Sequence, residues 1–192
     1  MEFLNINRKS IYTYRDYLQW PKEQRYEIIE GIPYLLAPSP SIKHQRILGE
    51  LFMRFKQYFK DTCEVLCTPC DVLLPESNEC IDEIKTVVQP DIYVVCDKSK
   101  LKENFCLGSP DLIVEITSPS SPSIDYVKKL NLYEKHMVKE YWIVDIKYNR
   151  ISIYNLQENN EYGSPAIYDK NNPIIKSEIF ENLTISLDEV FE

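Results

Sequence analysis

Several features that mark other protein classes are absent from this sequence. Glycine totals four in 192 residues, and there is no internal repeat, low-complexity tract or Gly/Ser-rich linker. Charged residues interrupt the longest aliphatic stretches within a few positions, so no segment is expected to cross a bilayer. The first residues carry no basic segment followed by an apolar one, so a secretory signal is not expected. We therefore expect a cytoplasmic protein with no membrane partner.

Acidic residues outnumber basic ones, and the formal net charge is -8. Because contacts to phosphate groups need Lys and Arg, this charge argues against a protein that coats nucleic acid non-specifically. The sign is uneven, since residues 41–60 carry a net charge of +4 and residues 157–192 carry -6. A local basic surface is therefore compatible with the sequence, although most such runs are solvated charges on a helix face.

The six cysteines are expected to be reduced thiols. Cys96 lies in a predicted core strand, and without an export signal disulfides are not favoured. The Cys63-x3-Cys67-x2-Cys70 run has irregular spacing for a zinc site and enters a strand-like segment. Buried or incidental thiols are therefore the favoured interpretation.

The spacing of apolar residues predicts an α/β or α+β fold around a central sheet. Helices are expected over residues 13–20, over residues 124–137, and over a long segment after Ser41 with Leu48, Leu51, Phe52, Phe55 and Phe59 on its apolar stripe. Strands are expected over residues 25–30, 33–37, 64–74, 87–96, 111–118, 140–145 and 150–156. Glu30-Gly31 is expected to be the tight turn between the first two strands.

Two acidic residues stand out because each lies in an aliphatic strand. Alternation along residues 111–118 puts Glu115 on one face with Asp111, Ile113 and Thr117. An ionised carboxylate in such surroundings is costly to desolvate, so it needs a cation, a metal or a raised pKa. Asp91 follows Pro90 and opens another aliphatic strand. Two carboxylates at a shared sheet edge would suit Mg²⁺, and the corresponding chemistry is phosphoryl transfer to water.

The helix after the acidic strand contains a candidate lysine. Its apolar stripe consists of Tyr126, Leu130, Tyr133 and Met137. At 100° per residue, Lys129 lies on the rim of this stripe, whereas Lys128 points to solvent. An inward ammonium could steady a scissile phosphate or polarise the attacking water. A snorkelling surface lysine fits the pattern about equally well.

Three further polar residues occupy weaker positions. Glu27, in the predicted hairpin, could orient a metal-bound water, although a surface acid is the commoner outcome. His44 lies in the apolar stripe of the long helix, where a hydrogen-bonded core histidine is more usual than a phosphate or water contact. Asp71 begins a strand and is a candidate for a supporting role at the same site.

Taken together, these segments resemble the Uma-type family of putative restriction endonucleases, which belongs to the PD-(D/E)XK nuclease superfamily. The likeness spans roughly residues 13–156. The matching pieces, in chain order, are Tyr26-Glu27…Gly31, Ala37-Pro38-Ser39 with His44, Pro69-x-Asp71-Val72, Gln89-Pro90-Asp91, Ser109-Pro-Asp-Leu-Ile-Val-Glu115…Ser118-Pro119, Asp125-x3-Lys129-x3-Tyr133 and Glu140-Tyr-Trp-Ile-Val-Asp145.

The resemblance implies a restriction-endonuclease-like core, with a central mixed sheet flanked by helices in the order α-β-β-β-α-β and additional β-hairpins. It implies Asp91 and Glu115 as ligands of Mg²⁺, with Mn²⁺ as the alternative ion, and Glu27 as a further catalytic acid. Thr117 occupies the usual lysine position of the superfamily, and Lys129 fits a lysine moved to the following helix. Asp111 is an alternative metal ligand.

The domain expectation follows from this resemblance and from the 44% hydrophobic content, which suffices for one core. We expect a single domain over residues 1–192. Within it, residues 1–40 would form an N-terminal helix and hairpin, residues 41–156 the nuclease core, and residues 157–192 a C-terminal extension.

The sequence thus predicts a Mg²⁺-dependent endonuclease that hydrolyses DNA. A homodimer is expected by analogy with nucleases that pair to cut two strands. Thr117 and the net acidity motivate an alternative from a different class, a catalytically inactive nuclease-fold module for nucleic-acid binding or assembly. A hydrolase of a smaller phosphodiester is a third alternative, which would suit an acidic surface better than duplex DNA does.

Overall fold

A six-stranded mixed sheet lies at the centre of the computed structural model, which describes residues 10–36, 39–117 and 124–192. Its strand order is β11-β10-β9-β8-β6-β3. The strands are β3 (Glu64–Cys67), β6 (Ile92–Val95), β8 (Leu112–Thr117), β9 (Glu140–Asp145), β10 (Arg150–Asn155) and β11 (Ala166–Tyr168). β8 and β9 are parallel and the other neighbours are antiparallel. The predicted central mixed sheet is therefore confirmed.

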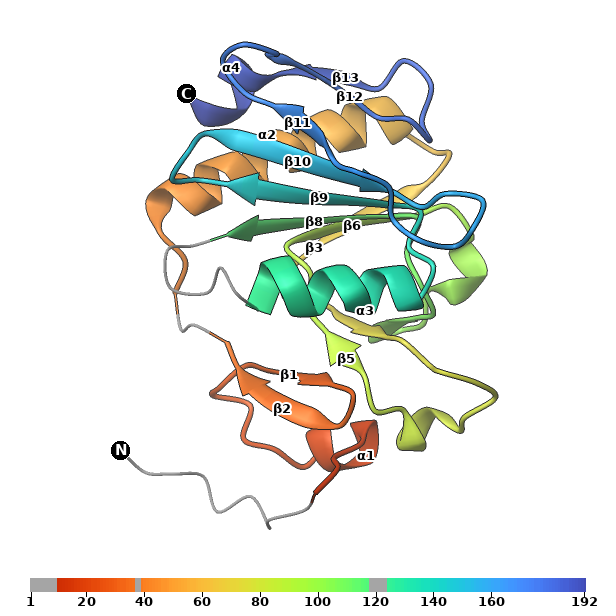
Figure 1. The fold of residues 1–192 in the computed structure, drawn as a ribbon. Coiled ribbons are helices and arrows are strands. Elements are labelled where there is room, and N and C mark those ends of the chain that lie inside the picture. The colour runs from red at the N-terminus through yellow and green to blue at the C-terminus, as the bar shows by residue number, and fades with distance from the viewer. Residues whose placement is uncertain (1–9, 37–38, 118–123) are drawn as a thin grey trace.

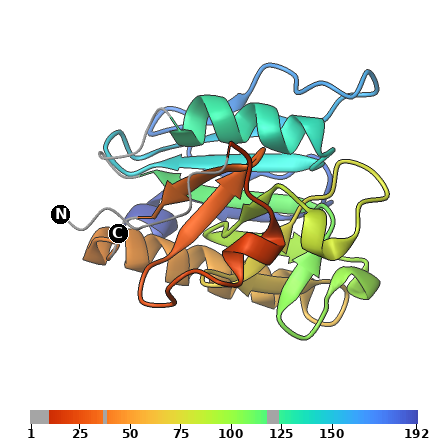
Figure 2. The same cartoon turned by 90° about the horizontal axis from the view of Figure 1, so that it is seen from below.

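Helices cover both faces of this sheet (Figures 1 and 2). On one face, α2 (Ile42–Phe59) packs against Leu112, Val114 and Ile116 of β8. On the other face, α3 (Leu130–Lys135) packs against residues of opposite parity, including Ile113. The alternation read from the sequence of β8 thus directs alternate side chains to two separate cores.

The α2 helix begins where its sequence provides a cap. The Ser41 hydroxyl accepts a hydrogen bond from the backbone N–H of His44 at 3.1 Å. The fully buried stripe runs at four-residue spacing through Ile47, Leu51, Phe55 and Phe59. The predicted stripe residues Leu48 and Phe52 are only partly buried, so the buried face is turned slightly from the predicted one.

A second sheet lies beside the first, in the order β2-β1-β5-β4-β7. Its strands are β1 (Tyr26–Ile29), β2 (Ile32–Leu35), β4 (Asp71–Leu73), β5 (Val87–Val88) and β7 (Phe105–Leu107). The short helix α1 (Tyr14–Tyr17) precedes β1 in the chain. The short helices η1 (Ile81–Glu83) and η2 (Lys98–Lys100) lie in the segments between β4 and β5 and between β6 and β7. Glu30 and Gly31 form the predicted turn, both with positive φ, as a two-residue hairpin of this kind requires.

Two of the predicted strands are each divided between the two sheets. The predicted strand over residues 64–74 forms β3 and β4, which are separated at Pro69. The predicted strand over residues 87–96 forms β5 and β6, which are separated at Pro90. Proline has no N–H to donate to a strand ladder, so each chain segment changes its partner there. Asp91 consequently lies where the two sheets meet.

The predicted helix over residues 124–137 is shorter and less regular than its sequence suggested. It begins as a π-helical segment, η3 (Ile124–Lys129), and α3 ends at Lys135. Met137 has φ of 59° and is 44% exposed, so its assignment to the buried stripe is wrong. The positive φ takes the chain out of the helix before the stripe can continue. The side chain of Tyr126 lies outside the described residues.

The C-terminal residues add a layer over α2 (Figure 1). β12 (Ile174–Lys176), β13 (Thr184–Ser186) and α4 (Leu187–Phe191) contribute apolar side chains to the same core. The fully buried Glu140 fastens this layer by accepting hydrogen bonds from Trp142 Nε1 at 2.7 Å, from the Ser177 hydroxyl at 3.0 Å and from the Glu178 N–H at 2.9 Å. Burial raises the pKa of Glu140 above its usual value.

The expectation that the cysteines are reduced is wrong for one pair. Cys63 and Cys96 form a disulfide with a Cα–Cα distance of 4.1 Å. The antiparallel register that pairs Glu64 with Val95 continues by one step to place Cys63 opposite Cys96. The strand register brings these residues together.

Within the part of the chain that the structure describes, no helix has the length and apolar character needed to span a membrane.

Candidate active site

Asp91 and Glu115 come from adjacent strands of the central sheet. The β6–β8 register pairs Ile92, the residue after Asp91, with Val114, the residue before Glu115. Asp91 also contacts β8 directly, because its Oδ2 accepts a hydrogen bond from the Ile116 N–H at 2.8 Å. Asp91 and Glu115 thus come from adjacent segments of the sheet, and the convergence of their carboxylates on one ion stays a prediction.

Lys129 lies between two carboxylates. Its Nζ is 2.8 Å from Oε1 of Glu115 and 3.0 Å from Oε1 of Glu27. The residue is 3% exposed, whereas Lys128 is exposed and donates to the Tyr34 hydroxyl at 2.8 Å. The inward direction predicted from helical spacing is confirmed. An ammonium buried in this way is stabilised by the negative charges beside it.

Glu27 reaches the site from the second sheet. It is 1% exposed, and its Oε1 accepts hydrogen bonds from both Lys129 and the backbone N–H of Gln89. The commoner outcome for a strand acid, exposure to solvent, does not hold here. β1 thus supplies a carboxylate to a cluster whose other members belong to β8 and to the helical segment 124–135.

Tyr133 is a member of this cluster that the sequence reasoning did not assign to the site. Its hydroxyl donates to Glu115 Oε1 at 2.7 Å, and the side chain is fully buried. Burial, followed by the charges of Glu115 and Glu27, raises the pKa of Tyr133 well above its ordinary value of 10.0. The hydroxyl therefore keeps its proton. Its position four residues after Lys129 on a helix is the signal that could have identified it.

His44 contacts Asp91 from the α2 side of the sheet. His44 Nε2 lies 3.2 Å from Asp91 Oδ2, which also accepts the bond from Ile116. His44 is buried, in keeping with the expectation of a hydrogen-bonded histidine. Its contact is the carboxylate of Asp91, so its role is to hold that side chain in place.

The remaining sequence candidates lie apart from this cluster. Asp111 binds Cys96 N–H at 2.8 Å and Lys139 Nζ at 2.7 Å. Four strand residues, roughly 13 Å, separate it from Glu115, so the structure does not bring this alternative ligand to the site. Thr117 donates to the Val144 carbonyl at 3.2 Å. Asp71 accepts from the Tyr17 hydroxyl and from the Gln89 side chain, and it is linked to the site only through Gln89.

The oxygen donors of Asp91 and Glu115 suit a magnesium ion completed by water and substrate oxygens. Among the described residues, Asp91 Oδ1 makes no hydrogen bond, and the side chain is 16% exposed. In the same part of the chain, no group of three or more His, Cys, Asp or Glu side chains is arranged to hold a metal. Mg²⁺ commonly takes only one or two carboxylates together with waters and phosphate oxygens, so this donor set fits it.

The comparison with protein families decides the classification. Residues 14–188 match the Uma2 family, which is described as "Putative restriction endonuclease". The chain belongs to this family. The resemblance drawn from its motifs is thereby confirmed, and the Uma2 match extends beyond residue 156, where the motif resemblance ended.

Two proteins similar to this chain can be compared with it. A protein from Anabaena variabilis, described as a putative nuclease belonging to DUF820, has a crystal structure that matches with a TM-score of 0.74. The two are 20% identical, and the match covers 93% of this chain and 97% of the other. The uncharacterised protein slr1290 of Synechocystis is 25% identical over 150 residues, which are 77% of this chain and 75% of that protein. The structural match confirms the restriction-endonuclease-like fold of this Uma2 protein.

Proposed function

We propose that this Uma2 protein is a metal-dependent endonuclease that hydrolyses phosphodiester bonds of DNA. The observation that carries the proposal is the contact of Lys129 with Glu115, whose neighbour in the chain, Ile116, donates its backbone N–H to Asp91. Carboxylates that bind a hard cation and an ammonium that faces the phosphate are the two elements such a hydrolysis needs.

Asp91 and Glu115 would hold the Mg²⁺ ion, which when bound would activate a water molecule and neutralise charge on the phosphate. Two contacts hold Oδ2 of Asp91 in position. Oδ2 is bound by the Ile116 N–H and contacts His44, so the carboxylate cannot rotate freely. Among the described residues, Oδ1 makes no hydrogen bond and would be the oxygen donor to the metal.

Lys129 would stabilise negative charge that develops on the phosphate. Glu27 and Glu115 hold its ammonium from two sides, and Tyr133 holds Glu115 in turn. A cation fixed before the reaction needs little reorganisation during it, which is how preorganised electrostatic groups lower a barrier. Glu27 therefore acts by positioning Lys129 in this proposal.

A plasmid-nicking assay tests the proposal. Purified protein is incubated with supercoiled DNA in Mg²⁺, in Mn²⁺ and in EDTA. We expect nicking that requires metal and that falls by about 100-fold or more in Asp91→Asn, since loss of one preorganised electrostatic group costs about 10²–10³ in rate. Asp61→Asn, an exposed acid, is the matched control and should nick at the wild-type rate. Equal rates in wild type and Asp91→Asn would overturn the site assignment.

The burial of the cluster favours a second candidate, a nuclease-fold module that binds nucleic acid without cutting it. Glu27, Lys129 and Glu115 are each no more than 5% exposed, and both carboxylates contact the Lys129 ammonium. This candidate predicts DNA binding with no nicking under any metal. The same plasmid assay, followed by a binding measurement on uncut DNA, distinguishes the two.

A further inference from the structure

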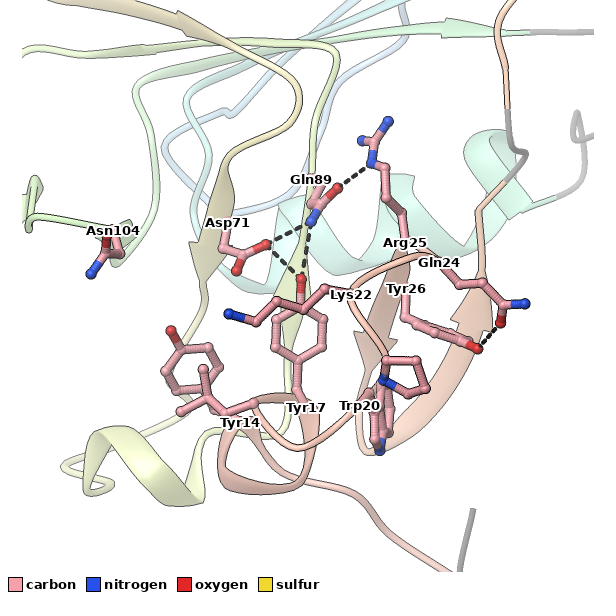
Figure 3. A pocket seen from close by; sticks show the side chains of 12 residues that line it. Tyr14, Tyr17, Trp20, Lys22, Gln24, Arg25, Tyr26, Asp71, Gln89 and Asn104 are labelled. Carbon is pink, nitrogen blue, oxygen red and sulfur yellow. Dashed lines mark hydrogen bonds between the residues drawn. The ribbon is translucent and has the colours of Figure 1, made fainter. Parts of the chain in front are cut away.

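A pocket of about 480 Å³ has Gln89 in its lining (Figure 3). Its volume falls in the range of small-molecule sites. It is formed by the α1 region, by the start of β1, by Asp71 after Pro69 and by Gln89 before Pro90. Its lining includes Tyr14, Tyr17, Trp20, Lys22, Arg25 and Tyr26.

Aromatic rings form one wall of this pocket. Trp20 forms T-shaped contacts with Tyr26 and Tyr17, with ring centroids 5.1 and 5.8 Å apart. Trp20 itself is half-buried, so part of its ring borders the pocket. The exposed part of an aromatic ring offers apolar surface on which another flat ring can stack.

Polar groups form the opposite wall (Figure 3). The Tyr17 hydroxyl donates to Asp71 Oδ1 at 2.8 Å, and Gln89 Nε2 donates to the same oxygen at 2.8 Å. Among the described residues, Asp71 Oδ2 makes no hydrogen bond, so an acceptor is available at this wall. Lys22 and Arg25 add positive charge to the lining. The pocket therefore combines stacking surfaces, a hydrogen-bond acceptor and cations.

Gln89 connects the pocket to the candidate active site. Arg25 Nε donates to the Gln89 side-chain oxygen at 2.8 Å, and the Gln89 backbone N–H donates to Glu27 Oε1 at 2.8 Å. Arg25 and Glu27 are two residues apart on the β1 segment, so both side chains project to the same side of the strand. These bonds link the lining of the pocket to Glu27, which holds Lys129.

We propose that this pocket binds an unstacked nucleobase of the substrate strand, next to the phosphate held at the candidate active site. The inference rests on the proposed nuclease function. Bases of single-stranded nucleic acid bind by stacking on aromatic side chains, while neighbouring Lys and Arg contact the backbone. A base within duplex DNA has no free face, so the pocket favours single-stranded or locally opened DNA.

The test measures binding of a short fluorescein-labelled single-stranded DNA to the full chain in EDTA, where cleavage does not occur. Stacking on one aromatic side chain is worth about 1–3 kcal/mol, so Trp20→Ala should weaken binding by about 5- to 150-fold. Trp20→Phe keeps a ring and should bind within about 3-fold of wild type. Tyr148→Ala removes an aromatic ring that is 62% exposed and outside the pocket lining, and it should bind like wild type.

Two measurements keep the test decisive if Trp20→Ala fails to fold. Lys22→Ala changes only an exposed side chain and should weaken binding with a shallower salt dependence. The chain contains two tryptophans, and Trp142 is fully buried, so quenching of tryptophan emission on DNA binding would report a base on Trp20. Absent quenching, or equal binding by wild type, Trp20→Ala and Lys22→Ala, overturns the pocket assignment.

The outcome separates this inference from the proposed function. Ring-dependent binding in EDTA with no nicking in Mg²⁺ would support the pocket and overturn the nuclease. Metal-dependent nicking with binding that is indifferent to Trp20 and Lys22 would support the nuclease and overturn the pocket.

Discussion

Two buried glutamates on neighbouring parallel strands are satisfied in opposite ways. Glu115 of β8 contacts the Lys129 ammonium and the Tyr133 hydroxyl. Glu140 of β9 accepts hydrogen bonds from neutral donors, namely an indole, a hydroxyl and backbone N–H groups. The neutral donors around Glu140 join separate segments of the chain and so stabilise the fold. The pairing of Glu115 with Lys129 instead holds a negative and a positive group next to each other. The second arrangement is the one that suits chemistry on a phosphate.

Removing the Lys129 ammonium should have the largest effect on stability. In Lys129→Met, the carboxylates of Glu27 and Glu115 stay buried without their shared ammonium. Breaking a buried ion pair in this way costs about 3–5 kcal/mol, so the free energy of unfolding should fall by that amount in urea titrations at neutral pH. The adjacent exposed Lys128→Met should change it by less than about 0.5 kcal/mol. A loss as small as that in Lys129→Met would contradict the charge pairing.

The hydroxyl that holds Glu115 offers a smaller and more selective change. Tyr133→Phe removes the donor to a charged carboxylate, and hydrogen bonds to charged groups contribute about 1.5–3 kcal/mol. Tyr93 is a matched control, because it is also fully buried and its hydroxyl contacts the neutral Cys70 thiol at 2.9 Å. Chemical denaturation should show a larger loss for Tyr133→Phe than for Tyr93→Phe. The reverse order would contradict the assignment.

The pH dependence of stability tests the environment of Glu140. Burial raises the pKa of Glu140 in the folded state, so the folded protein holds this proton to higher pH than the unfolded chain does. Its contribution to stability is therefore fully present below the ordinary pKa of 4.5 and declines as pH rises through the folded value. Glu140→Gln cannot titrate at this position. The stability of wild type relative to Glu140→Gln should fall as pH rises, and a constant difference would contradict the cause given for the shift.

Local sequence signals predicted the parts of the fold that depend on neighbouring residues. The strand Glu140–Asp145 has the predicted bounds, because a short aliphatic run with flanking polar residues defines a strand without reference to its partners. The Glu30-Gly31 turn and the inward direction of Lys129 also follow from local geometry. These features needed only strand alternation, turn preference and helical spacing.

Features that depend on strand pairing could not be predicted from the sequence. The divisions at Pro69 and Pro90 reflect membership of two sheets, and the Cys63–Cys96 disulfide reflects the β3–β6 register. The burial of Glu27 depends on β1 pairing with β5, since Gln89 follows β5 in the chain. Long-range pairings of this kind carry little local signal.

Direct measurement of Mn²⁺ binding by electron paramagnetic resonance tests the central claim that Asp91 and Glu115 form a metal site distinct from the structural Glu140. Titration of wild type should reveal a bound Mn²⁺ ion that is retained in Glu140→Gln and lost in Asp91→Asn and Glu115→Gln. Equal Mn²⁺ binding by wild type and Asp91→Asn, or no binding by wild type, would contradict the account.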